Sequence, residues 1–234
     1  MNLHHKNILV QLQKFAKKPT PNPAAARYIG TAHPLYPISV PQLREIAKQW
    51  AKENKDISAK ELDEVLDSLA EGESFHEKAL AGLLLEYTKK VRGELSLKKL
   101  GDRFLLLEGW AEIDSMASGK FSDNEVLNRW EEWQKFIQQF SKSKHIQQRR
   151  ASLVLLTKPL SHTTDEDLQA LAFEVIKKLQ HEKDIQITKA ISWLLRSMAR
   201  HHAKAVKVYL KENEALLPAI AVRETRRKLD TGKK

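Results

Sequence analysis

Helix-start signals recur along this chain at a nearly constant interval, and this regularity limits the possible folds more than any other feature. Ser58, Ser74 and Ser122 are each followed three residues later by glutamate, the arrangement of a capping box that satisfies two unpaired backbone N–H groups. Further helix caps are predicted at Ser39, Ser96, Thr164 and Asp184. Starts about 20 residues apart give two-helix units of roughly 40 residues, the period of HEAT-type repeats.

Apolar residues between these starts keep helical spacing, as in Leu62, Val65, Leu66 and Leu69, and no segment alternates convincingly as a strand. Proline and glycine fall between the predicted helices. We therefore expect an all-α protein, a curved α-solenoid of HEAT-like helix pairs with a concave, basic groove suited to an extended ligand. No low-complexity linker divides the chain, so residues 1–234 are predicted to form a single domain, with residues 228–234 as a frayed basic tail.

The composition excludes several classes of protein. The chain has no cysteine, which removes disulfides, thiolate zinc sites and a cysteine nucleophile. It has no glycine-rich phosphate loop, no H-E-x-x-H and no G-x-S-x-G motif. Neither a secretory signal nor an apolar run of roughly 18 residues is present, so the expected protein is soluble and intracellular.

Positive charge is concentrated in the second half of the chain. Residues 1–117 hold 17 Lys and Arg against 16 Asp and Glu, a net charge of +1, and residues 118–234 hold 23 against 14, a net charge of +9. A cationic face raises both encounter rate and affinity for nucleic acid, so a polyanionic partner is one reading. Solubility alone is the other, and charge by itself does not separate them.

The stretch GWAEIDSMA places an acid where an apolar residue is expected. On a helix, Trp110, Ile113, Asp114 and Ala117 share one stripe. In HIQQRRASLVLLTKP, Arg150 likewise lies on the apolar stripe, where an arginine needs an anion. The two residues could form a buried structural bridge, or each could serve a ligand, and the pattern leaves both readings open.

A third stretch, ITKAISWLLRSMARHH, sets an aromatic residue in a basic row. Trp193 shares a helix face with Lys189, Arg196 and Arg200 rather than with the apolar stripe. Cations interleaved with an aromatic ring suit phosphate and sugar contacts, although half-buried packing would also explain a surface tryptophan. The histidine pairs are adjacent in sequence and do not share a helix face, so no metal site is predicted.

Taken together, these stretches resemble the AlkD-like DNA alkylation repair family of HEAT-repeat DNA glycosylases, over nearly the whole chain. The segment AARYIGTAHPLYPISVPQLREIAKQW is similar to its N-terminal signature and includes Tyr28. GWAEIDSMA is similar to the family's W-x-x-x-D helix, QQRRASL to its R-A-A helix, and KAISWLLR to its second tryptophan helix. Occurrence of all four in order makes the resemblance specific.

The resemblance implies a monofunctional glycosylase that hydrolyses the N-glycosidic bond of cationic N3- or N7-alkylated purines and leaves an abasic site. Asp114 corresponds to the catalytic aspartate, and Trp110 and Trp193 to the active-site tryptophans. The resemblance and the basic rows together predict DNA contacts at Tyr28, Arg149, Arg150, Lys189, Arg196, Arg200, Arg226 and Arg227. The expected partner is duplex DNA with alkylated purines, bound by a monomer without metal or cofactor. The expected location is cytoplasmic and nucleoid-associated, as in a prokaryotic-type soluble protein.

Three positions depart from the family pattern. Pro37 replaces a glycine, Gly109 an aromatic residue before the tryptophan, and Gln147 a tryptophan. They leave the substrate range and the path of the DNA open. Two alternatives therefore stand beside the glycosylase: a non-catalytic relative that recognises damaged, bent or branched DNA, and a HEAT-type protein-interaction scaffold.

Overall fold

The computed structural model describes residues 1–233 and is all-α across them. The first half contains α1 (Leu3–Gln13), α2 (Pro23–Ile29), α3 (Val40–Glu53), α4 (Ala59–Ala70), α5 (Phe75–Tyr87), a 3-10 turn (Arg92–Glu94), α6 (Leu97–Phe104) and α7 (Gly109–Ala117). The second half contains α8 (Lys120–Asn128), α9 (Trp130–Ser141), α10 (Ile146–Leu160), α11 (Glu166–Leu179), α12 (Ile185–Met198), α13 (Ala203–Asn213) and α14 (Ala219–Thr231). This confirms the predicted all-α fold class.

Most of the predicted helix starts are confirmed. Ser58 and Ser74 form complete capping boxes at the starts of α4 and α5. Ser39, Ser96 and Asp184 are the N-caps of α3, α6 and α12. These agreements arise because a cap acts on backbone groups only two or three residues away, so its signal is contained in the local sequence.

Two predicted caps are wrong. Gly119 adopts a φ of +96° and brings the chain into α8 at Lys120, so Ser122 lies inside the helix, where its hydroxyl donates to the Gly119 carbonyl at 3.2 Å. At α11 the cap is Asp165 rather than Thr164, because the Asp165 carboxylate accepts from the Leu168 backbone N–H at 2.7 Å.

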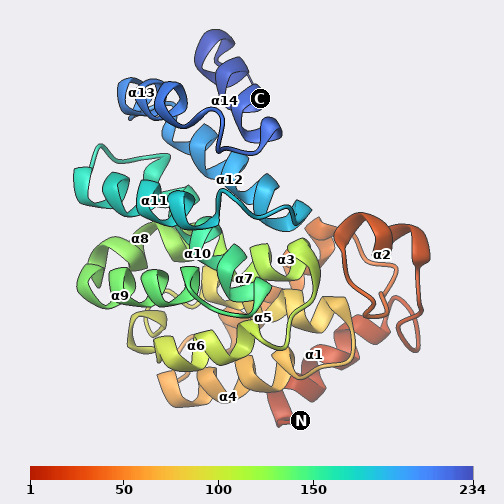
Figure 1. The fold of residues 1–234 in the computed structure, drawn as a ribbon. Helices are drawn as coiled ribbons and strands as arrows, with labels where there is room; N and C mark the ends of the chain where they lie inside the picture. Colours follow the sequence, from red (N-terminus) through yellow and green to blue (C-terminus); the bar gives the residue numbers. More distant parts are fainter. Residues whose placement is uncertain (234) are drawn as a thin grey trace. The chain divides into compact units, whose positions relative to one another are not determined.

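The chain divides into two compact units, residues 1–117 and residues 118–234, which are the same two halves whose net charges were compared in the sequence. Figure 1 traces both units in sequence colours. The single-domain organisation and the concave basic groove stay predictions.

The first unit has two layers of helices. Helix α5 packs between α3 and α7 in one layer, and α4 contacts α1 and α6 in the other. Helix α2 differs from the other helices of this unit, because it has no buried residue. The helix that it packs against is α7. In Figure 1 helix α2 stands at the margin of this unit.

The second unit repeats the layered pattern. Helices α8, α10, α12 and α14 pack in succession as one layer, while α9 and α11 contact each other and α10, and α13 contacts α12 and α14. Contacts between helices two apart along the chain, as in α8 with α10, α9 with α11, α10 with α12 and α12 with α14, are the stacking expected of an α-solenoid. The stripes predicted from sequence are buried, including Leu62, Val65, Leu66 and Leu69.

The C-terminal segment is more ordered than predicted. Helix α14 continues through Thr231 and ends at Gly232, which adopts a left-handed φ of +68°. Residues 228–231 are therefore helical rather than frayed, and Lys234 of the predicted tail lies outside the described residues. None of the helices in residues 1–233 combines the length and hydrophobicity needed to cross a membrane.

Candidate active site

Two glycines bring the segment after α2 against the start of α7. Gly30 ends α2 with a φ of +77°, and Gly109 begins α7 with a φ of +58°. A Cβ atom on Gly109 would lie 2.2 Å from the carbonyl oxygen of Gly30, so no larger residue fits without displacement. The aromatic residue that the family pattern has before the tryptophan is therefore incompatible with this backbone.

This approach joins Trp110 to Tyr28. The Trp110 indole N–H donates to the Tyr28 backbone carbonyl at 2.7 Å, and the two rings meet edge to face with centroids 5.6 Å apart. Trp110 is half-buried, whereas the Tyr28 side chain is 74 % exposed. Two predicted site residues far apart in sequence thus form one aromatic pair, with the tyrosine available to a ligand.

Asp114 lies one helical turn after Trp110 and is also half-buried. Helix α7 packs on α5, and its Ile113, Met116 and Ala117 are all buried. A Cβ atom on Gly82 of α5 would lie 2.2 Å from the Ser115 carbonyl oxygen, so the two helix backbones are in close contact. The predicted stripe therefore lies at the edge of the buried face, and α5 supports the helix that carries Trp110 and Asp114.

The acid that is completely buried is Glu112, which the sequence analysis did not select. It is 0 % exposed, and its carboxylate accepts from the Thr31 hydroxyl at 2.7 Å and from the Glu108 backbone N–H at 2.7 Å. His33 Nδ1 lies 2.8 Å from the same carboxylate. The sequence did contain a signal for the burial of Glu112, since this residue lies four residues before Met116 on the apolar side of the helix.

In the second unit, the two adjacent arginines of α10 have different surroundings. Arg150 is buried and donates through Nη1 to the backbone carbonyl of Gln186 on α12. Arg149 forms a two-point ion pair with Glu182, at 2.7 and 3.0 Å, and also donates to the carbonyls of Ser143 and Lys144. Arg149 is thus engaged within the unit through several of its donors, and its predicted DNA contact stays a prediction.

Helix α12 carries Lys189, Trp193 and Arg196 of the predicted basic row, and Arg200 lies after its end. Lys189 and Arg200 are exposed, and Trp193 and Arg196 are half-buried. Arg196 Nη2 lies 3.4 Å from the carboxylate of Glu224 on α14, which also accepts from the Ser192 hydroxyl at 2.6 Å. Helix α12 therefore offers one exposed cation, one paired cation and one indole. Arg200 follows two residues after the helix ends at Met198, so its predicted place on the helix face of Trp193 is wrong.

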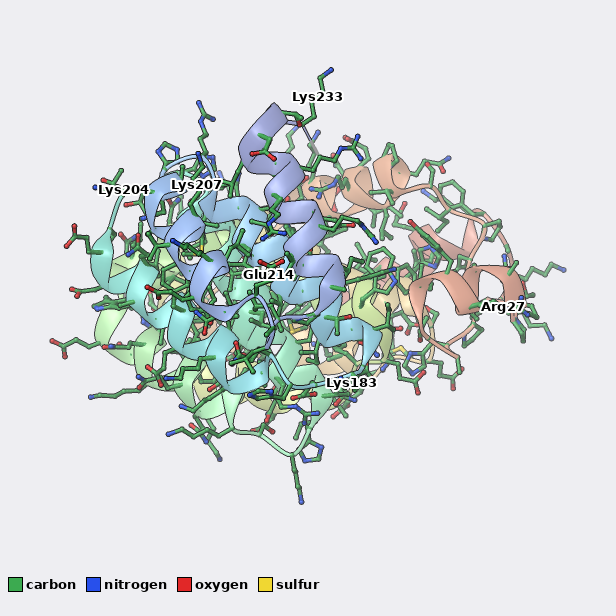
Figure 2. All side chains as sticks on the ribbon, turned by 45° about the horizontal axis from the view of Figure 1, so that its top comes forward. Arg27, Lys183, Lys204, Lys207, Glu214 and Lys233 are labelled. Carbon is green, nitrogen blue, oxygen red and sulfur yellow. The ribbon has the colours of Figure 1, made fainter. Side chains whose placement is uncertain are left out.

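Helix α14 adds further cations to the second unit. Arg226 is exposed and paired with Glu214 at 2.5 Å, and Arg227 is exposed. Figure 2 shows Lys204 and Lys207 projecting from α13 and Lys183 projecting before α12. The positive charge of this unit is therefore spread over several helices, and α12 is distinguished by the indole in its row rather than by charge alone.

The predicted site residues fall into one group in each unit. Trp110, Asp114 and Tyr28 come from the first unit, and the arginines, Lys189 and Trp193 come from the second. Among the described residues, no group of three or more His, Asp or Glu side chains is arranged to hold a metal ion. The available chemistry is that of a half-buried carboxylate, indole rings and cationic side chains.

The fold and these groups define a protein of stacked helices with features suited to a nucleic acid: a carboxylate and an aromatic pair on one unit, and an indole in a basic row on the other. The model of the DNA alkylation repair enzyme family matches residues 8–229, and the chain belongs to this family. Membership gives the protein a role in the repair of alkylation damage, with DNA as its partner.

One solved structure, described as a predicted DNA alkylation repair enzyme from Enterococcus faecalis, is similar in fold. The TM-score is 0.73 at 20 % sequence identity, over 92 % of this chain and 99 % of that chain. A comparison with curated proteins found no match. The likeness to the solved structure supports the fold, and the family match supports the role in repair.

Proposed function

We propose that this protein is a monofunctional DNA glycosylase that hydrolyses the N-glycosidic bond of cationic N3- or N7-alkylated purines in duplex DNA and leaves an abasic site. The observation that carries the proposal is the arrangement on α7. Trp110 and Asp114 lie one turn apart at the edge of the buried face, both half-buried, on a helix supported by α5. Family membership supplies the DNA-repair context.

The chemistry needs one carboxylate in this case. An alkylated purine already carries positive charge and leaves without being protonated, whereas ordinary glycoside hydrolysis uses two carboxyl groups. The sugar develops oxocarbenium character as the bond opens, and a carboxylate near it stabilises that charge. At about 4 Å and an effective dielectric near 20, the attraction is roughly 4 kcal/mol. By transition-state arithmetic this corresponds to about a thousandfold in rate.

Asp114 has a second task in this mechanism. A water molecule must attack the sugar carbon after the base departs, and the same carboxylate can orient that water or accept its proton. A lysine Schiff base is not required, because hydrolysis is completed by water. The product is therefore an abasic site with an intact backbone.

The aromatic side chains suit a cationic nucleotide. The indole rings of Trp110 and Trp193 offer electron-rich faces, and cation–π contacts contribute about 0.5 to 2 kcal/mol each. Tyr28, which packs edge-on against Trp110, has the exposure to contact a sugar or phosphate. In the proposed mechanism these rings hold the damaged nucleotide while the carboxylate acts on its sugar.

Phosphate contacts are assigned to the cations according to their availability. Lys189, Arg200 and Arg227 are exposed and are the first candidates. Arg196 and Arg226 can contribute if their ion pairs with Glu224 and Glu214 are exchanged for phosphate. Arg149 and Arg150 complete the predicted set, and Arg150 also stabilises the second unit through Gln186.

The test is release of free base from duplex DNA that carries N7-methylguanine, with wild type beside Asp114→Asn. We expect the variant to bind duplex DNA nearly as wild type does and to release base about a hundredfold or more slowly, since the amide cannot stabilise the cationic sugar. Asp102→Asn is the control, because it removes an exposed carboxylate from another helix of the same unit.

The outcomes separate the proposal from its alternatives. Wild-type release from Asp114→Asn would contradict the catalytic role. Salt-sensitive binding without release by any of the three proteins would favour the non-catalytic DNA-binding relative. A fall in unfolding temperature in Asp114→Asn, with base release unchanged, would support the hypothesis of a structural bridge with Arg150.

A further inference from the structure

Residues 20–35, here called the α2 segment, hold Tyr28 but contribute little to the apolar core. The segment closes on itself where Thr20 and Leu35 exchange two backbone hydrogen bonds, at 2.9 and 2.8 Å. Helix α2 within it has no buried residue. Figure 2 shows Arg27 projecting outward from this helix. The segment is therefore held in place by its polar contacts rather than by apolar packing.

Those polar contacts meet at the start of α7. The backbone N–H of Ala32 donates to the Glu108 carboxylate at 2.9 Å, and the Thr31 hydroxyl donates to Glu112. His33 lies against the same Glu112 oxygen, and its backbone N–H donates to the Thr31 hydroxyl at 3.1 Å. Three consecutive residues of the α2 segment are thus bound to two carboxylates, that of Glu112 in α7 and that of Glu108 directly before this helix.

Glu112 makes most of these polar contacts. Its carboxylate is fully buried, so each of its hydrogen bonds compensates for lost hydration, and loss of a donor is costly. It binds both the α2 segment and the backbone of Glu108, at the turn where α7 begins. The buried ammonium of Lys78, held by the carbonyls of Ala70 and Leu106, adds electrostatic attraction to Glu112.

We propose that Glu112 is a positioning residue of this site: it holds the α2 segment against α7 and thereby sets the Tyr28–Trp110 pair in the geometry that receives the nucleotide. The effect passes through Trp110, whose indole N–H depends on the Tyr28 carbonyl for its partner. The role in base release rests on the proposed glycosylase function. The role in holding Tyr28 and Trp110 together does not depend on it.

A matched control exists in the same unit. Glu77 is also a buried glutamate that accepts from a backbone N–H and a hydroxyl, both of Ser74, and lies 2.8 Å from a histidine nitrogen, that of His5. It caps α5 and makes no hydrogen bond to the α2 segment among the described contacts. Glu77→Gln therefore reproduces the chemical change of Glu112→Gln at a place that does not hold Tyr28.

The experiment combines a spectroscopic and a kinetic measurement. The indole N–H signals of the five tryptophans are recorded by nitrogen-15 NMR, and the Trp110 signal is assigned with Trp110→Phe. In Glu112→Gln we expect that signal to shift and its exchange with solvent to accelerate about tenfold or more. Single-turnover base release is expected to fall about tenfold or more while duplex affinity changes less than about threefold.

A second pair of variants guards against misfolding of Glu112→Gln. Thr31→Val removes the hydroxyl that donates to Glu112 at nearly constant volume, and Thr31→Ser retains it. We expect Thr31→Val to reproduce the indole shift and the slower release, and Thr31→Ser and Glu77→Gln to behave as wild type. Rescue by the serine hydroxyl would identify the hydrogen bond itself as the cause.

The inference is overturned if Glu112→Gln and Thr31→Val leave the Trp110 signal and base release as in wild type, or if Glu77→Gln changes both as strongly. Absence of base release from wild type would reject the proposed glycosylase instead. The positioning of Trp110 by Glu112 would then be decided by the indole signal alone.

Discussion

Gly30 and Gly109 decide how closely the end of α2 can approach the start of α7. Both adopt positive φ, and a side chain on Gly109 would collide with the Gly30 carbonyl. This contact brings Tyr28 within hydrogen-bonding reach of Trp110. Two residues without side chains therefore permit the close approach that brings two aromatic residues of the candidate site together.

His76 gives a residue-scale prediction about pH. It is buried, its Nδ1 accepts from the Tyr36 backbone N–H at 3.1 Å, and burial lowers its pKa to about 4 from an ordinary value of 6.5. The unfolded chain therefore binds a proton below about pH 6.5 that the folded chain refuses until about pH 4, so stability falls over this window as pH decreases. Between about pH 7.5 and pH 5 the loss is about 2 kcal/mol.

Urea unfolding of wild type and His76→Asn at both pH values measures this effect. The Asn Oδ1 atom can keep the bond from Tyr36 but does not titrate, so the variant is expected to lack this part of the pH dependence. The difference between the two proteins isolates His76 from the other titrating groups. An equal loss of stability in both proteins on acidification would contradict the assignment.

At the scale of elements, α7 and α12 present different side chains beside their buried stripes. Helix α7 is supported by α5 and presents one carboxylate and one indole at the edge of its buried face. Helix α12 is buried along Ile187, Ile191, Leu194 and Met198 and presents cations with an indole on its other side. Each helix buries an apolar stripe, and the remaining positions are available for binding.

Lys189 on α12 and Arg200 just after this helix give a prediction about the salt dependence of DNA binding. Lys189→Ala and Arg200→Ala are each expected to reduce the magnitude of the log–log salt slope by about 1, because each removes one phosphate contact. Lys204→Ala is the matched control, since it removes an exposed cation from α13 of the same unit. Fluorescence anisotropy with an undamaged duplex measures the slopes, and an equal change in the Lys204 variant would argue against a specific role for α12.

At the scale of the whole molecule, charge divides with the two units. The first unit has a net charge of +1 and contains Asp114, and the second has a net charge of +9 and contains the basic row. A nearly neutral unit does not repel phosphate as an acidic one would, and the second unit provides long-range attraction. The division of the carboxylate and most of the positive charge between the two units is therefore compatible with weak repulsion of phosphate by the first unit and with long-range attraction of DNA by the second.

The whole-molecule prediction is steep salt dependence. If about five phosphates are neutralised, affinity for duplex DNA is expected to fall with a log–log slope near −4 to −5. Equilibrium binding over a series of salt concentrations measures this slope for wild type. A flat dependence with weak affinity would favour the protein-interaction scaffold over both DNA-binding functions.

Local signals in the sequence account for most of the helix pattern. Caps such as Ser58 and Ser74 act within three residues, and apolar spacing acts within four, so both can be read without knowing the path of the chain. The errors at Ser122 and Thr164 arose where a neighbouring residue, Gly119 or Asp165, started or capped the helix instead. The resemblance selected Tyr28, Trp110 and Asp114, and the structure joined the first two.

The sequence by itself determined the all-α class, most helix starts, the buried stripes and the division of charge, because these depend on residues close together in the chain or on composition. Only the tertiary structure decided that Glu112 rather than Asp114 is the fully buried acid of α7, that Arg149 is paired with Glu182, and that the α2 segment is held by α7. The physical reason is distance along the chain. Thr31 and Glu112 are 81 residues apart in sequence, and a hydrogen bond between them exists only after folding brings the α2 segment and α7 together.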